Sequence, residues 1–381
     1  MKILFYIAIF SLFYVFIGYP LLLLILNKIN NSKTVNSNEK QMLPTISVIV
    51  SAYNEEKHIS KKIYSLLEQS YPKDKLEIII GSDGSTDQTV SIIRKFQTEN
   101  KNIKLIESLE NIGKCNMINK LINHVEGEII VFSDAASILE KDCIKEIANS
   151  YRDGNVGGVA GNLVYKKIDT SSTSDQQGLF SKYEKFIKKQ ESKYGSLVTA
   201  SGALFSIRKE LYLESNNASI PEDFLLPLNV NNENKRFVYC EKAIAFDEPT
   251  KDYKQEIKMR KRVSNGSFQA IFYAFQNLKR LHSLNKFSFS LISHKVLRNF
   301  SFFPLIILFF TNLLLIGETL YNVSFGVQVF CYTLALIEIK FQSNSRLTKI
   351  CGYFFLINYG CLVGFMDCIR GKNVDKWATE R

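Results

Sequence analysis

Residue types that often mark a functional site are scarce in this chain of 381 residues. Its four histidines show no metal-ligand spacing, which argues against a zinc site. The seven cysteines are odd in number and include no Cys-x-x-Cys pair. They are therefore expected to be reduced residues of a cytoplasmic domain and of membrane helices.

Motifs of several common nucleotide- and nucleic-acid-binding classes are also missing. No Gly-x-x-x-x-Gly-Lys-Ser/Thr occurs, which excludes a P-loop ATPase, and no Gly-x-Gly-x-x-Gly follows the first predicted strand, which argues against a dinucleotide dehydrogenase. The net charge of +11 could serve a nucleic acid, but no such motif appears. A basic surface beside anionic lipid headgroups is the favoured explanation.

Charge is absent from long stretches at both ends. Residues 3–26 carry none, and that length spans a ~30 Å hydrocarbon core. A cleaved signal peptide is the alternative, but the run exceeds an apolar signal core of ~7–15 residues and no small-residue cleavage site follows. The ranges 302–320, 325–339 and 350–369 each hold a single charged residue, so they are predicted to be three further membrane helices.

Loops rich in lysine and arginine tend to stay on the cytoplasmic side of a membrane, and this charge rule orients the segments. The stretches 28–40 and 341–349 are basic, whereas the link 321–326 has neither residue. The large middle region is therefore predicted to be cytoplasmic, with that link outside. Four full spans would place the basic tail outside, against the rule, so one apolar segment is expected not to span fully.

The expected organisation follows from these segments. It comprises an N-terminal transmembrane helix (1–28), a polar linker (29–44), a cytoplasmic domain (45–275), interfacial helices (276–301), C-terminal transmembrane helices (302–370) and a tail (371–381).

Strand and helix patterns alternate within the middle region. Strands are predicted at 46–50, 76–80, 103–106 and 128–132, and helices at 59–69, 88–98 and 116–124. This order predicts an α/β domain with a mostly parallel sheet flanked by helices.

Polar residues follow three of these strands. They are Tyr53-Asn54-Glu55, Asp83-Gly84-Ser85 and Ser133-Asp134. Each group could simply cap a helix. Because ligands gather at the carboxyl ends of parallel strands, a shared ligand site is the favoured interpretation. The helix starts there would suit a phosphate-bearing ligand.

The sequence resembles membrane-bound family 2 glycosyltransferases, which have the GT-A fold. The resemblance covers residues 45–275 and rests on an ordered set of motifs. These are ISVIVSAYNEE (46–56), IIIGSDGSTDQT (78–89), NIGKCNMIN (111–119), VFSDAAS (131–137), SGALFSIRKELY (201–212), IPEDFLLPL (220–228) and RKRVSNGSFQA (260–270).

The resemblance implies an enzyme that moves a sugar, with inversion, from a nucleotide-diphosphate donor, most simply a uridine diphosphate sugar. It assigns nucleotide contact to residues at the first two strand ends, namely Ala52, Tyr53, Asn54, Glu55 and Asp83. Lys114 is placed near the nucleotide by the Gly-Lys pair, although it could be a solvated surface lysine.

The later motifs imply the chemistry. Asp223 matches the catalytic base that takes the proton of the attacking acceptor hydroxyl. Gly202 and Glu222 are then on the acceptor side. From the residues alone, Glu222 and Asp223 could be first-turn acids favoured by the helix dipole.

Arg260 and Arg262 belong to a basic cluster that could stabilise the leaving diphosphate or only contact the membrane surface. The cluster coincides with the family's Gln-x-x-Arg-Trp segment, but here Met259 replaces the Gln and Val263 replaces the Trp. Loss of that Trp makes a processive, hyaluronan- or cellulose-like synthase the alternative rather than the first choice.

Asp134 matches the first acid of the family's Asp-x-Asp motif, and Ala136 replaces the second. One carboxylate can still ligate Mg²⁺ or Mn²⁺, since such an ion keeps waters and takes oxygens from substrate phosphates. The metal is therefore expected to bind weakly alone and well with the nucleotide.

The favoured function is sugar transfer to a glycan or a lipid-linked acceptor in cell-envelope, capsule or exopolysaccharide assembly. The enzyme would be a multi-pass protein of the plasma or inner membrane that contacts membrane lipids and no nucleic acid. An alternative of another class is a non-catalytic, nucleotide-binding scaffold subunit.

Overall fold

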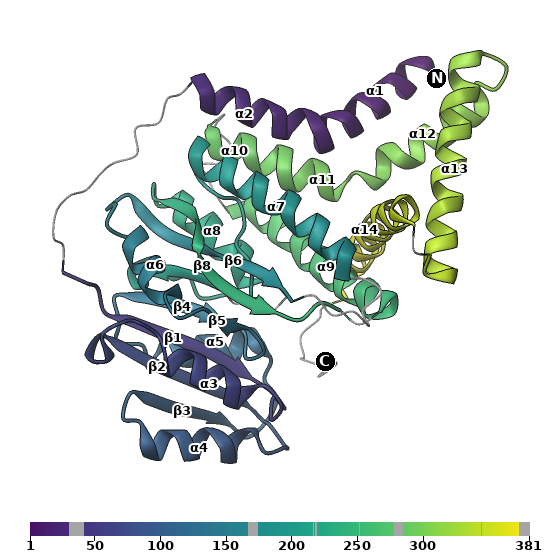
Figure 1. The fold of residues 1–381 in the computed structure, drawn as a ribbon. Helices are drawn as coiled ribbons and strands as arrows, with labels where there is room; N and C mark the ends of the chain where they lie inside the picture. The colour runs from purple at the N-terminus through teal and green to yellow at the C-terminus, as the bar shows by residue number, and fades with distance from the viewer. Residues whose placement is uncertain are drawn as a thin grey trace.

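A computed structural model describes residues 1–29, 42–166, 174–215, 217, 219–250, 252–277, 285–343 and 345–372. Within them, an α/β domain lies at one end of the molecule and apolar helices at the other (Figure 1).

The first half of the sheet is parallel, as expected. Its strands are β1 (Ile46–Ala52), β2 (Leu76–Asp83), β3 (Ile103–Ser108) and β4 (Ile129–Ser133). β1 pairs in parallel with β2 and with β4, and β2 pairs with β3. The connecting helices are α3 (Ile59–Leu67), α4 (Thr89–Glu99) and α5 (Lys114–Ile122). The predicted strands and helices of this half are confirmed.

The second half mixes directions. It contains β5 (Ile138–Leu139), β6 (Val156–Tyr165), β7 (Leu204–Arg208) and β8 (Arg236–Asp247). β7 runs antiparallel to β4 and to β6, whereas β6 and β8 are parallel. The eight described strands follow the order β3-β2-β1-β4-β7-β6-β8-β5. The sheet is therefore mixed but mostly parallel.

β1 is buried on both sides because helices cover both faces of the sheet. Val48 points into a core shared with Ile63 of α3, and Ile49 points into a second core shared with Met117 of α5. This alternation is the two-residue period of a strand. The other helices of the domain are η2 (Lys73–Lys75), α6 (Cys143–Ser150), α7 (Ser174–Tyr194), η3 (Lys209–Leu211), α8 (Glu222–Asn232) and α9 (Tyr253–Asn277).

The N-terminal apolar segment is one rod of three pieces, α1 (Lys2–Phe13), the π-helical η1 (Tyr14–Gly18) and α2 (Tyr19–Ile29). Pro20 has no N–H for the carbonyl of Phe16, four residues earlier. The Tyr183 hydroxyl of α7 donates to that carbonyl at 3.0 Å. The irregular turn therefore fastens the rod to the α/β domain.

The C-terminal apolar helices are α10 (Lys286–Ser290), η5 (Leu291–Val296), α11 (Leu297–Asn299), α12 (Phe302–Leu314), α13 (Thr319–Phe341) and α14 (Arg346–Ile369). The described part of the chain has three helices that are long and apolar enough to cross a membrane, 2–29, 319–341 and 346–369. A fourth candidate is the pair 286–299 and 302–314, which is bent by 54°.

The break between α12 and α13 differs from the expected link at 321–326. It falls at residues 315–318, because Gly317 has a φ of +120° and donates its N–H to the Asn322 side chain at 3.0 Å. α12 is therefore shorter, and α13 longer, than the apolar pattern predicts.

Candidate active site

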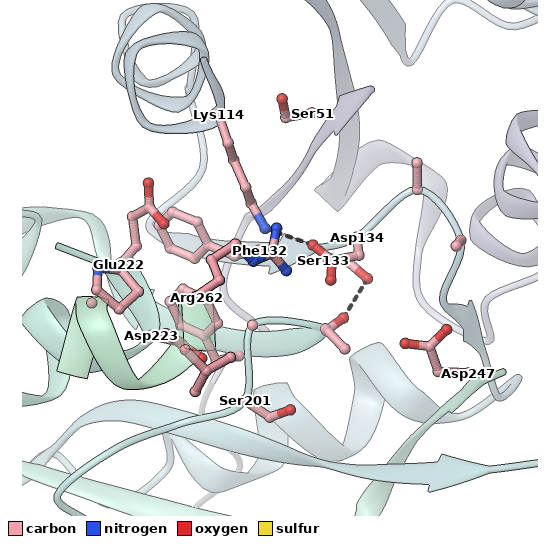
Figure 2. Close-up of a pocket in the computed structure, with 18 of the residues that line it drawn as sticks. Ser51, Lys114, Phe132, Ser133, Asp134, Ser201, Glu222, Asp223, Asp247 and Arg262 are labelled. Atoms are coloured by element: carbon pink, nitrogen blue, oxygen red, sulfur yellow. Dashed lines mark hydrogen bonds and ion pairs between the residues drawn. The ribbon is translucent and has the colours of Figure 1, made fainter. Parts of the chain in front are cut away.

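A cavity of about 850 Å³ opens at the carboxyl ends of β1 and β4. Its wall is built from the loop after β1, the start of α5, the loop after β4, residues 199–203, the start of α8 and one side of α9 (Figure 2). Most of the predicted site residues line it, namely Tyr53, Asn54, Glu55, Lys114, Asp134, Gly202, Glu222, Asp223, Arg260 and Arg262. The ordered motifs therefore converge on one cavity.

The loops that follow β1 and β2 are fastened to each other. Asn54 has a φ of +53°, and its side-chain oxygen accepts the N–H of Thr86 at 2.8 Å. The N–H of Glu55 donates to the Thr89 hydroxyl at 2.8 Å. The polar residues at these two strand ends thus shape the cavity rim partly by binding one another.

Asp83 and Ala52 lie behind this rim, and both are fully buried. The Asp83 carboxylate accepts the N–H groups of Ile112 and Gly113 at 2.8 and 3.0 Å. Burial raises the pKa of Asp83, and the two backbone bonds oppose that rise. In this structure Asp83 holds the loop that leads into Lys114, and its contact with a nucleotide stays a prediction.

Asp134 is paired with Lys114 across the cavity. The Lys114 ammonium lies 2.6 Å from Asp134 Oδ1, and the two side chains are only 27% and 22% exposed (Figure 2). Burial alone would lower the pKa of Lys114, but the carboxylates of Asp134, Glu222 and Asp223 outweigh it and raise that pKa. Lys114 is therefore a charged residue of the site and not a solvated surface lysine.

The donor set suits only a metal that arrives with its own ligands. Among the described residues, no group of three or more His, Cys, Asp and Glu side chains could hold a metal ion. Asp134 could supply one ligand once it parts from Lys114, and Ala136 supplies none. This fits an ion that is completed by water and by phosphate oxygens.

Lys62 is a buried residue behind the cavity wall that the sequence analysis did not single out. Its ammonium is fully buried beneath the loop that bears Asp134, where it donates to Ser133 Oγ at 2.6 Å and to the Ser137 carbonyl at 2.8 Å. Ser133 Oγ in turn donates to the Ala203 carbonyl at 2.9 Å. A signal was present, because Lys62 falls on the apolar face of its helix with Ile59.

Asp247 is a second missed residue. It ends β8, is 5% exposed and lines the cavity, as does Ala136 (Figure 2). Its carboxylate accepts the N–H of Glu248 at 2.9 Å. Because β8 was not recognised in the sequence, this strand end could not be counted among the acidic ones.

Asp223 lies at the start of α8 and lines the cavity, and one backbone hydrogen bond of the helix is missing at this point. Pro227 lacks the N–H that would bond the carbonyl of Asp223, four residues earlier. That carbonyl instead accepts the N–H of Ala200 at 2.8 Å and the hydroxyl of Thr199 at 3.1 Å. A side chain at Gly202 would lie 3.4 Å from Asp223 Oδ2, so this loop passes close to the carboxylate.

Glu222 precedes Asp223 at the start of α8. Burial raises the pKa of Glu222, and nearby Lys114 opposes the rise. Among the described residues, its buried Oε1 atom has no hydrogen-bond partner. Such an oxygen can accept a hydrogen bond from a substrate hydroxyl, consistent with the predicted acceptor-side place.

The two predicted arginines have different surroundings. The Arg260 guanidinium lies 2.8 Å from Glu256 and 4.8 Å from the centre of the Phe180 ring, and it also contacts Tyr353. Burial would lower the pKa of Arg260, but Tyr353 and Glu256 outweigh it and raise that pKa. Both arginines line the cavity. Binding a diphosphate would require Arg260 to break part of this set of contacts, and a nucleotide contact of either arginine stays a prediction.

The matches to known proteins agree with one another. Residues 47–214 match the model of the family described as "Glycosyl transferase family 2". A poly-beta-1,6-N-acetyl-D-glucosamine synthase of Staphylococcus epidermidis is 29% identical over 181 residues, which are 47% of this chain and 43% of that protein. A probable glycosyltransferase of Bacillus subtilis, YdaM, is 24% identical over 65% of this chain and 62% of its own. The chain thus covers less than two thirds of the length of these relatives.

A solved structure shares nearly the whole fold. It is described as the mannosyltransferase PcManGT from Pyrobaculum calidifontis in complex with GDP-Man and Mn²⁺. The TM-score is 0.75 at 21% identity, and the match covers 97% of this chain and 100% of the other. This likeness includes the apolar helices as well as the sheet.

Proposed function

Since the chain is a member of glycosyltransferase family 2 with a GT-A-like fold, we propose that it transfers a sugar, with inversion, from a nucleotide-diphosphate donor to a hydroxyl of a membrane-proximal or lipid-linked acceptor. The pathway would be cell-envelope, capsule or exopolysaccharide assembly. The observation that carries this proposal is the meeting of the Lys114–Asp134 pair and the Asp223 carboxylate in one cavity.

The donor end of the cavity is proposed to lie at Tyr53, Asn54 and Glu55, with the diphosphate directed towards Lys114 and Arg262. Two cations on one wall suit the negative charge that develops on the leaving diphosphate. A uridine nucleotide is the simplest expectation. The solved neighbour, which shares the fold, is described as a complex with GDP-Man.

Asp134 would hold a divalent ion that enters with the donor, and Mn²⁺ accompanies the donor in the solved neighbour. When bound, that ion would neutralise charge on the diphosphate. Lys114 would then leave Asp134 and donate to a phosphate oxygen. Lys62 would keep the loop that bears Asp134 in place from below.

Asp223 is proposed as the base. A carboxylate at the start of a helix, close to the 199–203 loop, can accept the proton of an acceptor hydroxyl held there. Glu222, with an unpartnered oxygen among the described residues, would orient that acceptor. The base acts as the acceptor oxygen bonds to the anomeric carbon and the bond to the diphosphate breaks.

A processive synthase is the second candidate, and the similarity to a polymer-forming enzyme of Staphylococcus epidermidis favours it. Against it, Val263 stands where the related synthases have a Trp, and this valine lines the cavity. The length of the product on a gel separates the two, since a ladder of high mass would indicate processive synthesis.

The proposal is tested by incubating the full-length, detergent-solubilised protein with nucleotide sugars, with and without Mn²⁺ or Mg²⁺. A donor should raise the apparent melting temperature, because it binds the native state. Release of free nucleotide should follow once an acceptor is present. Nucleotide binding with neither transfer nor hydrolysis would support the scaffold alternative, and no binding of any donor would overturn the proposal.

A further inference from the structure

The last apolar helix, α14, is long and apolar enough to cross a membrane, yet it packs along α9 of the catalytic domain as well as against α13. We propose that α14 lies in the membrane interface along α9 without crossing the bilayer, so that the C-terminal tail is on the same side as the active site. This inference concerns the membrane arrangement and goes beyond the proposed sugar transfer.

Two glycines of α14 bring it into direct contact with α9. A Cβ atom on Gly360 would lie 2.8 Å from Arg260 Cβ, and one on Gly364 would lie 2.7 Å from Ser264 Cβ. Larger residues at either position would push the two helices apart. Small residues with this four-residue spacing allow close helix packing.

The contacts extend along the helix rather than meeting at one crossing point. Near its start, the Tyr353 hydroxyl donates to Glu256 at 3.1 Å. Near its end, Asp367 pairs with Lys261 at 2.8 Å. The backbone carbonyl of Lys372, just beyond the helix, accepts from the Asn265 side chain at 3.2 Å. α9 therefore holds α14 from Tyr353 to just beyond its end, whereas Thr348 in its first turn donates to Glu338 of α13 at 2.8 Å.

α9 itself cannot be in the hydrocarbon core. It carries Lys254, Glu256, Lys258, Arg260, Lys261 and Arg262, and one of its sides lines the active-site cavity. Charged side chains in the centre of a bilayer are costly. A helix bound to α9 over most of its length must therefore stay at the same membrane surface.

The outer side of α14 suits a bilayer surface. Its exposed large apolar residues are Leu347, Ile350, Tyr359, Met366 and Ile369. Basic residues flank them at both ends, with Arg346 and Lys349 at the start and Arg370 and Lys372 at the end. An apolar face bordered by lysine and arginine is typical of a helix that lies in the headgroup region over anionic lipids.

The preceding helices fit the same arrangement. Lys2 pairs with Glu318 at 2.8 Å, so the turn between α12 and α13 lies beside the start of the N-terminal rod. At the other end of α13, Glu338 accepts the Tyr253 hydroxyl of α9 at 2.6 Å. α13 therefore returns to the catalytic side. The second half of the N-terminal rod contacts α7, but its first half, α1, packs on α12. Three crossings, by this rod, the bent helix pair and α13, then leave all the basic segments on the catalytic side, as the preference of Lys and Arg for the cytoplasmic side requires.

The experiment places a short epitope tag at one of three sites in the full-length protein and tests protease access in sealed membrane vesicles. The sites are the C-terminus, the surface turn at Gly154 and the link at Gly317, where a Cβ atom at either glycine would meet nothing within 4 Å. The C-terminal tag should share the accessibility of the Gly154 tag, with the Gly317 tag opposite to both. A C-terminal tag that follows the Gly317 tag would overturn the proposal. This readout needs no sugar transfer.

A second measurement tests the contact itself. Gly364→Leu should lower the melting temperature and reduce donor turnover, since it separates α14 from the helix that carries Arg262. Gly326→Leu is the matched control, because a side chain there would meet nothing within 4 Å. Equal behaviour of the two variants would show that α14 does not pack on α9.

Discussion

Lys114 is paired with Asp134, the acid that we expect to bind a metal, and this leads to an unusual prediction for Lys114→Met. Removing the ammonium leaves Asp134 without its 2.6 Å partner and adds no bulk. We expect Mn²⁺, in the absence of nucleotide, to bind the variant more tightly than the wild type. In an ordinary nucleotide-binding lysine, the same change would leave the affinity for free metal unaltered.

The size of the effect follows from the burial of the pair. Fully exposed ion pairs contribute about 0–1 kcal/mol, and hydrogen bonds to charged groups about 1.5–3 kcal/mol. With the two side chains 27% and 22% exposed, the Lys114–Asp134 pair falls between these classes. A contribution of about 1–2 kcal/mol corresponds to a roughly 5–30-fold gain in Mn²⁺ affinity.

The assay is a titration of free Mn²⁺ by electron paramagnetic resonance on the full-length protein in nanodiscs, first alone and then with a nucleoside diphosphate. Lys120→Met is the matched control, because Lys120 lies on the same helix but is exposed and bonds the Glu107 carbonyl at 2.7 Å. Wild type and control should bind Mn²⁺ weakly alone and more tightly with nucleotide. Lys114→Met should show a smaller difference between the two conditions. An unchanged or weaker affinity of Lys114→Met for Mn²⁺ alone would refute the reasoning.

Two further changes test the supports of the site by their effect on thermal unfolding in detergent. Burial lowers the pKa of Lys62 from 10.5 to about 7. The folded state therefore bears the full cost of burying this charge at and below about pH 7, and that cost falls as pH rises from there towards the unfolded value of 10.5. The melting temperature of Lys62→Met relative to the wild type should therefore be highest at or below neutral pH and should fall in alkali, whatever the loss of the two hydrogen bonds costs; a difference independent of pH would contradict this. Gly84→Ala should cost about 1–2 kcal/mol of folding free energy, since Gly84 has a φ of +68° and its Cβ would lie 2.6 Å from the Asn111 nitrogen. Gly154→Ala, where nothing lies within 4 Å, is the control, and equal melting temperatures would count against the argument.

The parallel half of the sheet could be predicted because each of its strands is a short apolar run that ends in a polar turn. The same pattern places Asp134 and the Tyr53–Glu55 loop at one edge, and the structure brings them to one cavity. The half that contains β6 and β8 was not recognised. β8 alternates buried and exposed positions only in part and includes Glu241 and Lys242, so it lacks a clear apolar run.

The roles of individual side chains were harder to predict than their neighbourhood. Arg260 and Arg262 are two residues apart, yet Arg260 is drawn into contacts with Glu256 and Tyr353, and Tyr353 is more than ninety positions away. Lys62 sits next to the solvent-facing Lys61, and only the packing of its helix separates the two. Such distinctions depend on tertiary contacts that no local pattern contains.

The membrane arrangement shows the same limit. Hydropathy identifies α14 as a candidate membrane span. Four crossings would place the basic C-terminal tail outside, against the preference of Lys and Arg for the cytoplasmic side. Neither could tell which segment stays on the surface. The contacts of Gly364 and Asp367 with α9 supply the missing information.

The central claim, that Asp223 is the base of an inverting sugar transfer, is tested most directly by Asp223→Asn. Thr199 and Ala200 bond the backbone carbonyl of Asp223 and not its side chain. Replacing the side-chain carboxylate by the amide of Asn should therefore leave the 199–203 loop in place. We predict that donor affinity stays within about twofold of the wild type, while the transfer rate falls by roughly 10²–10⁴-fold, the usual contribution of a general base. Sugar transfer by Asp223→Asn at the wild-type rate would contradict the account.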